Sequence, residues 1–333
     1  MKLHKPIKLL FSVLLLVCPA IIRPAAATGE FTIIVLPDTQ NYSQYYPSIF
    51  TSQTQWIVDN KSNLDIAFVA HVGDVVNNNT TTEYDNADAA MDLLDGGDVP
   101  YGTCPGNHDS GNLYNTYFGT ARYSAKPYFG GSLDDRNNYF LFSAGGMDFI
   151  IIFLKYAPET SVLNWADARL KQYPSRRGII VSHSILNVGG TQSSWTTEGQ
   201  NIFNALSDNP NLFLMLCGHN HGEGRRTDTG TNGNTIYSVL ADYQSYPNGG
   251  NGFLRIMEFD PAVDEINVTT YSPYMGGTGS AFTLSYGMPY LYGDISTPAD
   301  CDVDGSDLVA LIADPSLIEL SAFAGNFGDS LCQ

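Results

Sequence analysis

The sequence predicts an α/β fold in which helices pack outside a core of two β-sheets. Short apolar runs of strand length alternate with helical stretches through the first two thirds of the chain. Residues 235–271 then alternate apolar and polar side chains between Asn/Gly turns, which is typical of antiparallel strands. The chain has 333 residues, enough for one large core and a small appendage.

The expected elements follow one another in regular order. Strands are predicted where an apolar run ends in a break, at 31–36, 66–72, 99–104, 139–142, 149–154, 178–182 and 214–217. Helices are predicted between them, at about 56–64, 84–94, 163–172 and 200–206. Residues 110–138 are rich in Gly, Asn, Ser and Tyr, and we expect a long loop region there.

The beginning of the chain has the pattern of a secretory signal peptide over residues 1–27. Three lysines precede an apolar run at 9–17, and three alanines at 25–27 offer a cleavage site. Cys18 would allow a lipoprotein anchor, but Val17 before it is not the small residue that such processing needs. No segment reaches about 18 uninterrupted apolar residues, so we expect a secreted or periplasmic protein without a membrane span.

Acidic side chains dominate the charge. Removal of residues 1–27 would take away four of the 16 basic side chains and no acidic one, leaving 12 basic against 34 acidic, a net charge near −22. Such a field repels the phosphate backbone of nucleic acids and anionic lipids. We therefore expect no stable nucleic-acid binding, although a local metal site reverses the sign at its mouth.

Side chains with metal-ligating chemistry gather just after the predicted strands. Five of the six histidines lie beyond residue 27, and four of those five belong to this set. Carboxylates, imidazoles and an amide suit Mn, Fe or Zn better than an all-oxygen calcium cage. The set is too large for one ion, whereas two ions about 3.5–4 Å apart would use it all in a phosphoryl displacement. The residues are Asp38, Asp74, Asn107, His108, Asp109, His183, His219 and His221.

In this pattern the chain resembles the calcineurin-like metallophosphoesterases. The motifs of that family appear here in order as PDTQ (37–40), GDVV (73–76), GNHD (106–109), SHS (182–184) and GHNH (218–221). The resemblance extends over residues 30–290 and implies a four-layer α/β/β/α sandwich. It also implies a hydrolase for phosphomonoesters or phosphodiesters, in which a metal-bound hydroxide attacks phosphorus.

Residue roles follow from the same resemblance. It implies that Asp38 and His221 hold a first divalent transition metal ion, Mn, Fe or Zn. A second ion would be held by Asn107, His183 and His219, and Asp74 would bridge the two. The resemblance further implies that His108 stabilises charge on the phosphoryl group or protonates the leaving group, and that Asp109 orients His108.

The chain departs from the family pattern at two positions. The first motif usually ends in His, and here Gln40 stands there, which ligates a metal only through a neutral amide oxygen. The first site is then looser, or prefers a harder ion such as Mn. In the purple acid phosphatase branch a tyrosine follows the bridging Asp by three residues. Asn77 occupies that position, so we expect no tyrosinate ligand and no obligatory ferric iron.

Residues 294–333 form a separate acidic module by composition, with eight acids and no Lys or Arg. Alternating aspartates before Gly305 resemble a degenerate dockerin-like calcium loop, which would bind Ca²⁺ and offer a surface to a protein partner. The alternative is a solvated acidic cap without calcium. The candidate calcium ligands are Asp300, Asp302, Asp304 and Asp307, and Cys301 and Cys332 are the candidate disulfide.

Two hypotheses from different classes remain open at this level. One is an exported dinuclear phosphoesterase acting on a small phosphate ester. The other is a secreted calcium-dependent adhesion or scaffold protein whose metal site is inactive, against which the presence of His108 and Asp109 argues. We expect His71 to be a structural core histidine, and Cys104 and Cys217 to be buried free thiols, with a disulfide as the alternative.

Overall fold

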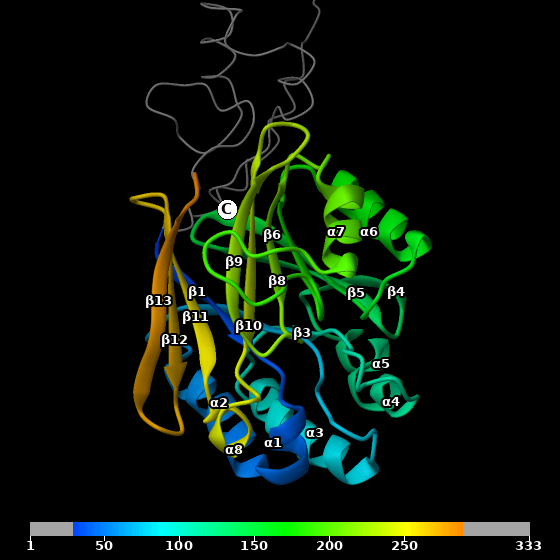
Figure 1. The fold of residues 1–333 in the computed structure, drawn as a ribbon, viewed down its shortest axis with the longest axis vertical. Helices are drawn as coiled ribbons and strands as arrows, with labels where there is room; N and C mark the ends of the chain where they lie inside the picture. The colour runs from blue at the N-terminus through cyan, green and yellow to red at the C-terminus, as the bar shows by residue number, and fades with distance from the viewer. Residues whose placement is uncertain (1–28, 289–333) are drawn as a thin grey trace, which may run out of the picture.

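The computed structural model describes residues 29–288 and has two β-sheets with helices outside them, as the sequence predicts (Figure 1). The predicted signal peptide over 1–27 and the acidic module over 294–333 lie outside the described residues. So do all six residues proposed for calcium or for a disulfide: Asp300, Asp302, Asp304, Asp307, Cys301 and Cys332. Within the described part, no helix is long and apolar enough to cross a membrane.

The first sheet has six strands in the order β13-β12-β11-β1-β2-β3. Its parallel part is β1 (Phe31–Leu36), β2 (Ile66–His71) and β3 (Tyr101–Thr103), and β1 is buried over its whole length. Such continuous apolar runs are typical of parallel strands that are covered on both faces. The antiparallel part is β11 (Leu254–Asp260), β12 (Glu265–Ser272) and β13 (Gly277–Ser285).

The second sheet has seven strands in the order β4-β5-β6-β7-β8-β10-β9. Its centre is parallel and contains β6 (Met147–Leu154), β7 (Arg177–Ser182), β8 (Leu212–Cys217) and β10 (Thr235–Asp242). The edge strands β4 (Phe129–Asp134) and β9 (Gly222–Thr229) run antiparallel to their neighbours, and β5 (Asn137–Ala144) runs antiparallel to both β4 and β6. The parallel pairing of β10 with β8 differs from the antiparallel arrangement expected after residue 235.

Apolar side chains between the sheets form the main core. Phe68 of β2 packs against Phe142 of β5 with ring centroids 4.9 Å apart, and Phe31 of β1 lies 5.5 Å from Phe149 of β6. These contacts explain the layer order, because side chains of alternate residues along each strand face the other sheet. A second cluster lies between the seven-stranded sheet and the helices α6 (Thr160–Gln172) and α7 (Thr197–Leu206).

Helices cover the outer faces of the two sheets (Figure 1). Helices α2 (Pro47–Asn60) and α3 (Thr81–Gly96) contribute to the core of the six-stranded sheet, and Phe50 of α2 lies 6.1 Å from His71 of β2, ring centroid to ring centroid. The short helices are α1 (Gln40–Tyr45), α4 (Leu113–Phe118), α5 (Thr120–Tyr123) and α8 (Pro247–Gly250). The four-layer sandwich is thereby confirmed.

One expected loop region is wrong. Residues 110–138 contain α4, α5 and β4 instead of a long loop. Tyr114, Phe118 and Tyr123 from this segment are fully buried, and the Tyr114 and Tyr123 hydroxyls lie 2.7 and 3.1 Å from Thr103 Oγ1. Burial of these aromatic rings orders a segment whose polar composition alone favours a loop.

Candidate metal centre

The carboxyl ends of the parallel strands of both sheets meet at one place. The loops after β1, β2, β3, β7 and β8 carry all the residues that the sequence analysis proposed for the two transition metal ions and for catalysis, with Gln40 at the start of α1. The loops also bind one another, since Thr39 N donates to Asp74 O at 3.1 Å and Gly218 N donates to His183 O at 3.0 Å. Parallel strands send their C-terminal ends to the same edge, which explains the convergence.

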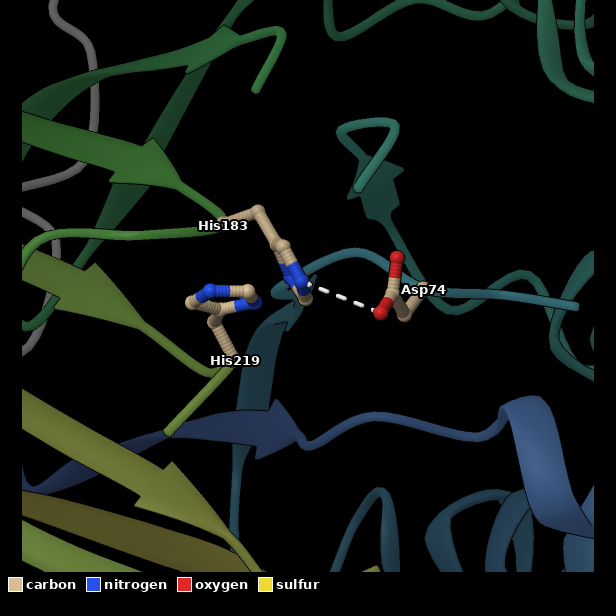
Figure 2. A group of neighbouring side chains, drawn as sticks. All are labelled: Asp74, His183 and His219. Carbon is tan, nitrogen blue, oxygen red and sulfur yellow. Dashed lines mark ion pairs between the residues drawn. The ribbon is translucent and has the colours of Figure 1, made fainter. Parts of the chain in front are cut away.

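Asp74, His183 and His219 form the most compact group of ligand atoms. One such atom from each residue lies within 4.8 Å of the others. Figure 2 shows the imidazoles of His183 and His219, which follow β7 and β8, lying side by side and facing the Asp74 carboxylate. The two ring centroids are 4.9 Å apart. A carboxylate and two imidazoles at this spacing suit a transition metal ion.

His183 is oriented by a backbone contact. Its Nδ1 lies 2.9 Å from Val72 O, so this nitrogen carries a hydrogen and Nε2 is the ring nitrogen that faces the centre. The Nε2 atom lies 3.1 Å from Asp74 Oδ2, yet it forms no aligned hydrogen bond within residues 29–288. A buried imidazole nitrogen and a carboxylate oxygen that lie side by side without an aligned hydrogen bond are suited to ligate a common metal ion.

Asp38 and His221 belong to a second group, which contains two residues that the sequence analysis missed. Gln244 Nε2 lies 3.3 Å from Asp38 Oδ2 and 2.9 Å from His221 Nε2. The same nitrogen lies 3.3 Å from an oxygen of Asp242, the last residue of β10. An apolar run over 236–241 precedes Asp242, which is the signal that located the other strand-end residues.

Gln40 and Asn107 both present buried, unpaired amide oxygens. Gln40 Nε2 donates to Gln244 Oε1, while Gln40 Oε1 is buried and has no hydrogen-bond partner in the described part of the chain. Asn107 Oδ1 is likewise buried and unpaired over the described residues. Buried polar atoms without partners are costly, and beside these carboxylates and imidazoles each oxygen is available to ligate a cation.

The prediction that Asp109 orients His108 is wrong. The His108 Nδ1 atom lies 2.8 Å from Asn77 O, so a backbone carbonyl fixes the ring. Asp109 is fully buried and its carboxylate accepts backbone N–H groups of Val75, Val76 and Gly106 at 3.0, 3.2 and 2.9 Å. Asp109 therefore holds the loops after β2 and β3 together, and its hydrogen bonds within the described residues go to backbone N–H groups and not to the His108 ring.

Charge repulsion and burial set the protonation of the carboxylates. The pKa of Asp38 is raised well above its usual value by burial, then by the nearby Asp242 and Asp74 carboxylates. Burial also acts to raise the pKa of Asp74, but the His183 imidazole and the His108 N–H outweigh it and lower the pKa overall. The neighbouring carboxylates of Asp38, Asp74 and Asp242 make this site favourable for a bound cation.

The backbone conformation lets the loops that carry the candidate ligands approach one another closely. Asp74 and His219 have φ values of +51° and +73°, which non-glycine residues rarely adopt. A Cβ atom on Gly106 would lie 2.0 Å from Asp74 Oδ1, and one on Gly218 would lie 2.1 Å from Asp38 Oδ1. Only glycine permits these two contacts.

His71 and the two cysteines have the structural positions expected of them. His71 Nδ1 accepts from Gly73 N at 3.1 Å, and its Nε2 lies 2.9 Å from Thr39 Oγ1, so both ring nitrogens are occupied. Cys104 and Cys217 are buried and free, which confirms the preferred alternative.

Tyr156 is a further residue that the sequence analysis did not single out. Its ring centroid lies 5.6 Å from that of His219 and 6.0 Å from that of His183, so it forms an aromatic wall beside the centre. No pattern in the sequence marks it, because it lies in the loop after β6 without a neighbouring ligand.

Sequence comparison identifies the family. The model of the calcineurin-like phosphoesterase family matches residues 31–223. An uncharacterized protein of Bacillus subtilis (strain 168), YvnB, is 37% identical over 276 residues, which cover 78% of this chain and 21% of that protein. The chain thus spans about a fifth of the length of this relative.

Two solved structures are similar to this fold. Purple acid phosphatase PPD1 from yellow lupin (Lupinus luteus) seeds has a TM-score of 0.51 at 17% identity, over 77% of this chain and 54% of that one. GAP50, the anchor in the inner membrane complex of Plasmodium, has a TM-score of 0.49 at 13% identity, over 78% of this chain and 89% of that one. The first likeness supports the two-sheet sandwich, and the second is too slight to support an argument. With its family model matched over residues 31–223, the chain belongs to the calcineurin-like phosphoesterase family.

Proposed function

We propose that this chain hydrolyses phosphomonoester or phosphodiester bonds of a small substrate at a centre of two divalent transition metal ions, Mn, Fe or Zn. The observation that carries the proposal is the convergence of Asp74, His183 and His219, whose ligand atoms lie within 4.8 Å of one another. Buried, unpaired oxygens of Asn107 and Gln40 support it within the described residues.

The residues divide naturally between two ions. Asp38 and His221 would hold the first, His183, His219 and Asn107 the second, and Asp74 would lie between them. Asp74 is suited to a shared role because its Oδ1 accepts His108 N–H at 2.9 Å while its Oδ2 faces His183. When bound, the two ions would supply Lewis acidity to the phosphoryl oxygens and lower the pKa of a water molecule.

His108 would act on the leaving oxygen. Because Nδ1 is held by Asn77 O at 2.8 Å, Nε2 is the ring nitrogen left to bind or donate a proton. Asn77 stands where a purple acid phosphatase has its tyrosine, and here its side-chain amide donates to Gln44 at 2.6 Å. The side chain at this position is an amide bound to Gln44, so it supplies no tyrosinate ligand, while its backbone carbonyl orients His108.

Metal-dependent turnover tests the proposal. The protein would be stripped, reloaded with Mn²⁺, Zn²⁺ or Fe²⁺, and assayed with p-nitrophenyl phosphate and bis-p-nitrophenyl phosphate. We expect metal-restored hydrolysis that falls by about 10²–10⁴-fold in His108→Ala, the usual contribution of a positioned proton donor. Ser110→Ala, an exposed change in the same loop, is the matched control and should retain activity.

Two bound metals without turnover of either ester would contradict the proposal and favour the binding-protein alternative. The preferred ester would separate a monoesterase from a diesterase, which the metal ligands do not decide, since the surrounding loops select the substrate.

Export belongs to the same proposal. We base it on the lysine-rich start, the apolar run at 9–17 and the alanines at 25–27. Mass spectrometry of protein from the producing cells would show a mature N-terminus near residue 28. Recovery of the uncleaved chain inside the cells would contradict export and leave the enzymatic proposal untouched.

A further inference from the structure

The strongest feature outside the family motifs is the position of Asp242. Strand β10 pairs in parallel with β8, so its C-terminal end lies beside the loop that carries His219 and His221. The Asp242 side chain is fully buried, and its Oδ2 lies 4.0 Å from His221 Nε2. No lysine or arginine of residues 29–288 forms an ion pair with it.

The two oxygens of Asp242 have different surroundings. Oδ1 accepts the backbone N–H of Gln244 at 2.9 Å, which fixes the carboxylate plane. Oδ2 faces the interior of the group formed with Asp38 and His221. A carboxylate that ligates a metal ion is commonly oriented by a hydrogen bond to its other oxygen. Asp242 has this arrangement, because the backbone holds Oδ1 while Oδ2 faces the group.

One amide nitrogen occupies the centre of this group. Gln244 Nε2 lies 3.3 Å from Asp38 Oδ2, 3.3 Å from Asp242 Oδ2 and 2.9 Å from His221 Nε2. An amide nitrogen has only two hydrogens, so it cannot satisfy three acceptors at once. The electropositive amide thus marks a point around which two carboxylates and an imidazole converge, as they would around a cation.

Gln40 provides an independent sign of a ligand at the same place. Its side chain is 6% exposed, and Oε1 is buried without a hydrogen-bond partner in the described residues. Its Nε2 donates to Gln244 Oε1, which connects it to the group. A histidine at position 40 would add a nitrogen ligand, whereas the chain has a neutral oxygen there and an additional buried carboxylate, that of Asp242, at the same Gln244 amide.

We infer that Asp242 is a ligand of the first metal site, where it takes the place of the histidine that the family pattern has at position 40. Gln244 is a positioning residue whose amide moves aside when the ion binds. The first site then has the carboxylates of Asp38, Asp74 and Asp242 with a single imidazole, that of His221. Such an oxygen-rich set favours Zn²⁺ over Mn²⁺ less strongly than the second site does, because the second site has two imidazoles and suits Zn²⁺ or Fe²⁺.

Metal content and thermal melting test this inference, which rests on the proposed dinuclear centre. Wild type, Asp242→Asn and the control Asp59→Asn, an exposed aspartate of α2, would be dialysed against Mn²⁺ and counted by elemental analysis. We expect two ions per chain in wild type and control. In Asp242→Asn we expect one ion, or a first-site Kd raised by at least about 10-fold.

The metal-free Tm separates a ligand from a structural residue. Asp242→Asn removes a buried charge beside Asp38, so the metal-free Tm should not fall, while the rise in Tm on adding Mn²⁺ should shrink. If Asp242→Asn binds two ions with wild-type affinities, the inference about Asp242 is wrong, while the proposed dinuclear centre still stands. A lowered metal-free Tm would also overturn the inference, because it would show a structural role.

If Asp242→Asn does not fold, a second variant tests the first metal site. Gln40→His adds the imidazole that the family pattern contains and should shift the first site toward Zn²⁺ in competition dialysis against equimolar Mn²⁺ and Zn²⁺. An unchanged Mn/Zn ratio would overturn the inference. Wild type that binds no ion at all would instead overturn the dinuclear centre itself, and the inference with it.

Discussion

The carboxylates of Asp38 and Asp242 share one neighbour, the amide nitrogen of Gln244, which lies 3.3 Å from an oxygen of each. Both carboxylates are buried, and the ion pairs of residues 29–288 include no lysine or arginine partner for either. This shared amide, with a backbone N–H from His219 for Asp38 and one from Gln244 for Asp242, compensates two buried acids poorly. The metal-free protein therefore carries a local electrostatic cost at its centre, from which the first prediction follows.

Divalent ions should stabilise the fold. An ion that binds only the folded state adds about 2.7 kcal/mol to the free energy of unfolding at roughly 100 times its Kd. Calorimetry in EDTA and then with increasing Mn²⁺ should show a Tm that rises with metal concentration. A Tm that is independent of EDTA and Mn²⁺ would contradict a high-affinity site.

Asp74→Asn should impair both ions, because in the proposed centre Asp74 bridges them. We expect kcat/KM to fall by at least about 10²-fold, with fewer than two ions retained per chain. Elemental analysis and the ester assay on the same sample would check this. Full metal occupancy at unchanged activity would exclude the shared role of Asp74.

Gly106→Ala should disrupt the centre sterically, since the added Cβ would lie 2.0 Å from Asp74 Oδ1. Overpacking of this kind costs about 1–3 kcal/mol, and it should displace the carboxylate and weaken metal binding. Gly190→Ala is the matched control, because nothing lies within 4 Å of its added Cβ. Urea unfolding of both variants should show a large loss only for Gly106→Ala.

We expect Asp109 to contribute to stability and His108 to contribute to activity. Asp109→Ala leaves three buried backbone N–H groups without their acceptor and should lower the free energy of unfolding by about 3 kcal/mol. His108→Ala removes a half-buried ring and should lower activity with little loss of stability. Equal destabilisation by the two variants would show that His108 also has a structural role.

His71 should make stability depend on pH. Burial, and then the neighbouring His183, lowers the pKa of His71 to about 3 from the ordinary value of 6.5. Below pH 6.5 the unfolded chain therefore binds a proton at His71, whereas the folded chain does not. The free energy of unfolding then falls as pH falls, by about 1.4 kcal/mol per pH unit.

Comparison with His71→Gln isolates this contribution. Urea unfolding in EDTA at about pH 7 and about pH 5 should show a shallower pH dependence for His71→Gln, although the variant is less stable at neutral pH. EDTA removes metal ions, so protons released on metal binding do not add to the measured pH dependence. Equal pH dependence of wild type and variant would show that His71 accepts a proton in the folded state.

Tyr156 should act through its ring and not through its hydroxyl group. Its ring lies against His219 and His183, where it limits the freedom of both imidazoles. Tyr156→Phe should keep wild-type metal affinity, and Tyr156→Ala should lose about 10-fold. Isothermal titration with Zn²⁺ would distinguish the two variants.

Much of the candidate centre was predictable because its signals are local. An apolar run, a break and a polar side chain mark Asp38, Asp74, His183 and His219, each within a few residues. Parallel strands bring their C-terminal ends to one edge, so local signals far apart in the chain predict one site. The two-sheet fold followed from the same runs, since continuous apolar strands require cover on both faces.

The sequence by itself determined which side chains stand at strand ends and which family pattern they follow. Only the tertiary structure decided that β10 pairs in parallel with β8, which brings Asp242 and Gln244 to the centre. It also decided that His108 is oriented by Asn77 O while Asp109 binds backbone N–H groups. Strand direction and hydrogen bonds to the backbone depend on long-range packing, and any residue supplies the same carbonyl or N–H, so no pattern of side chains records them.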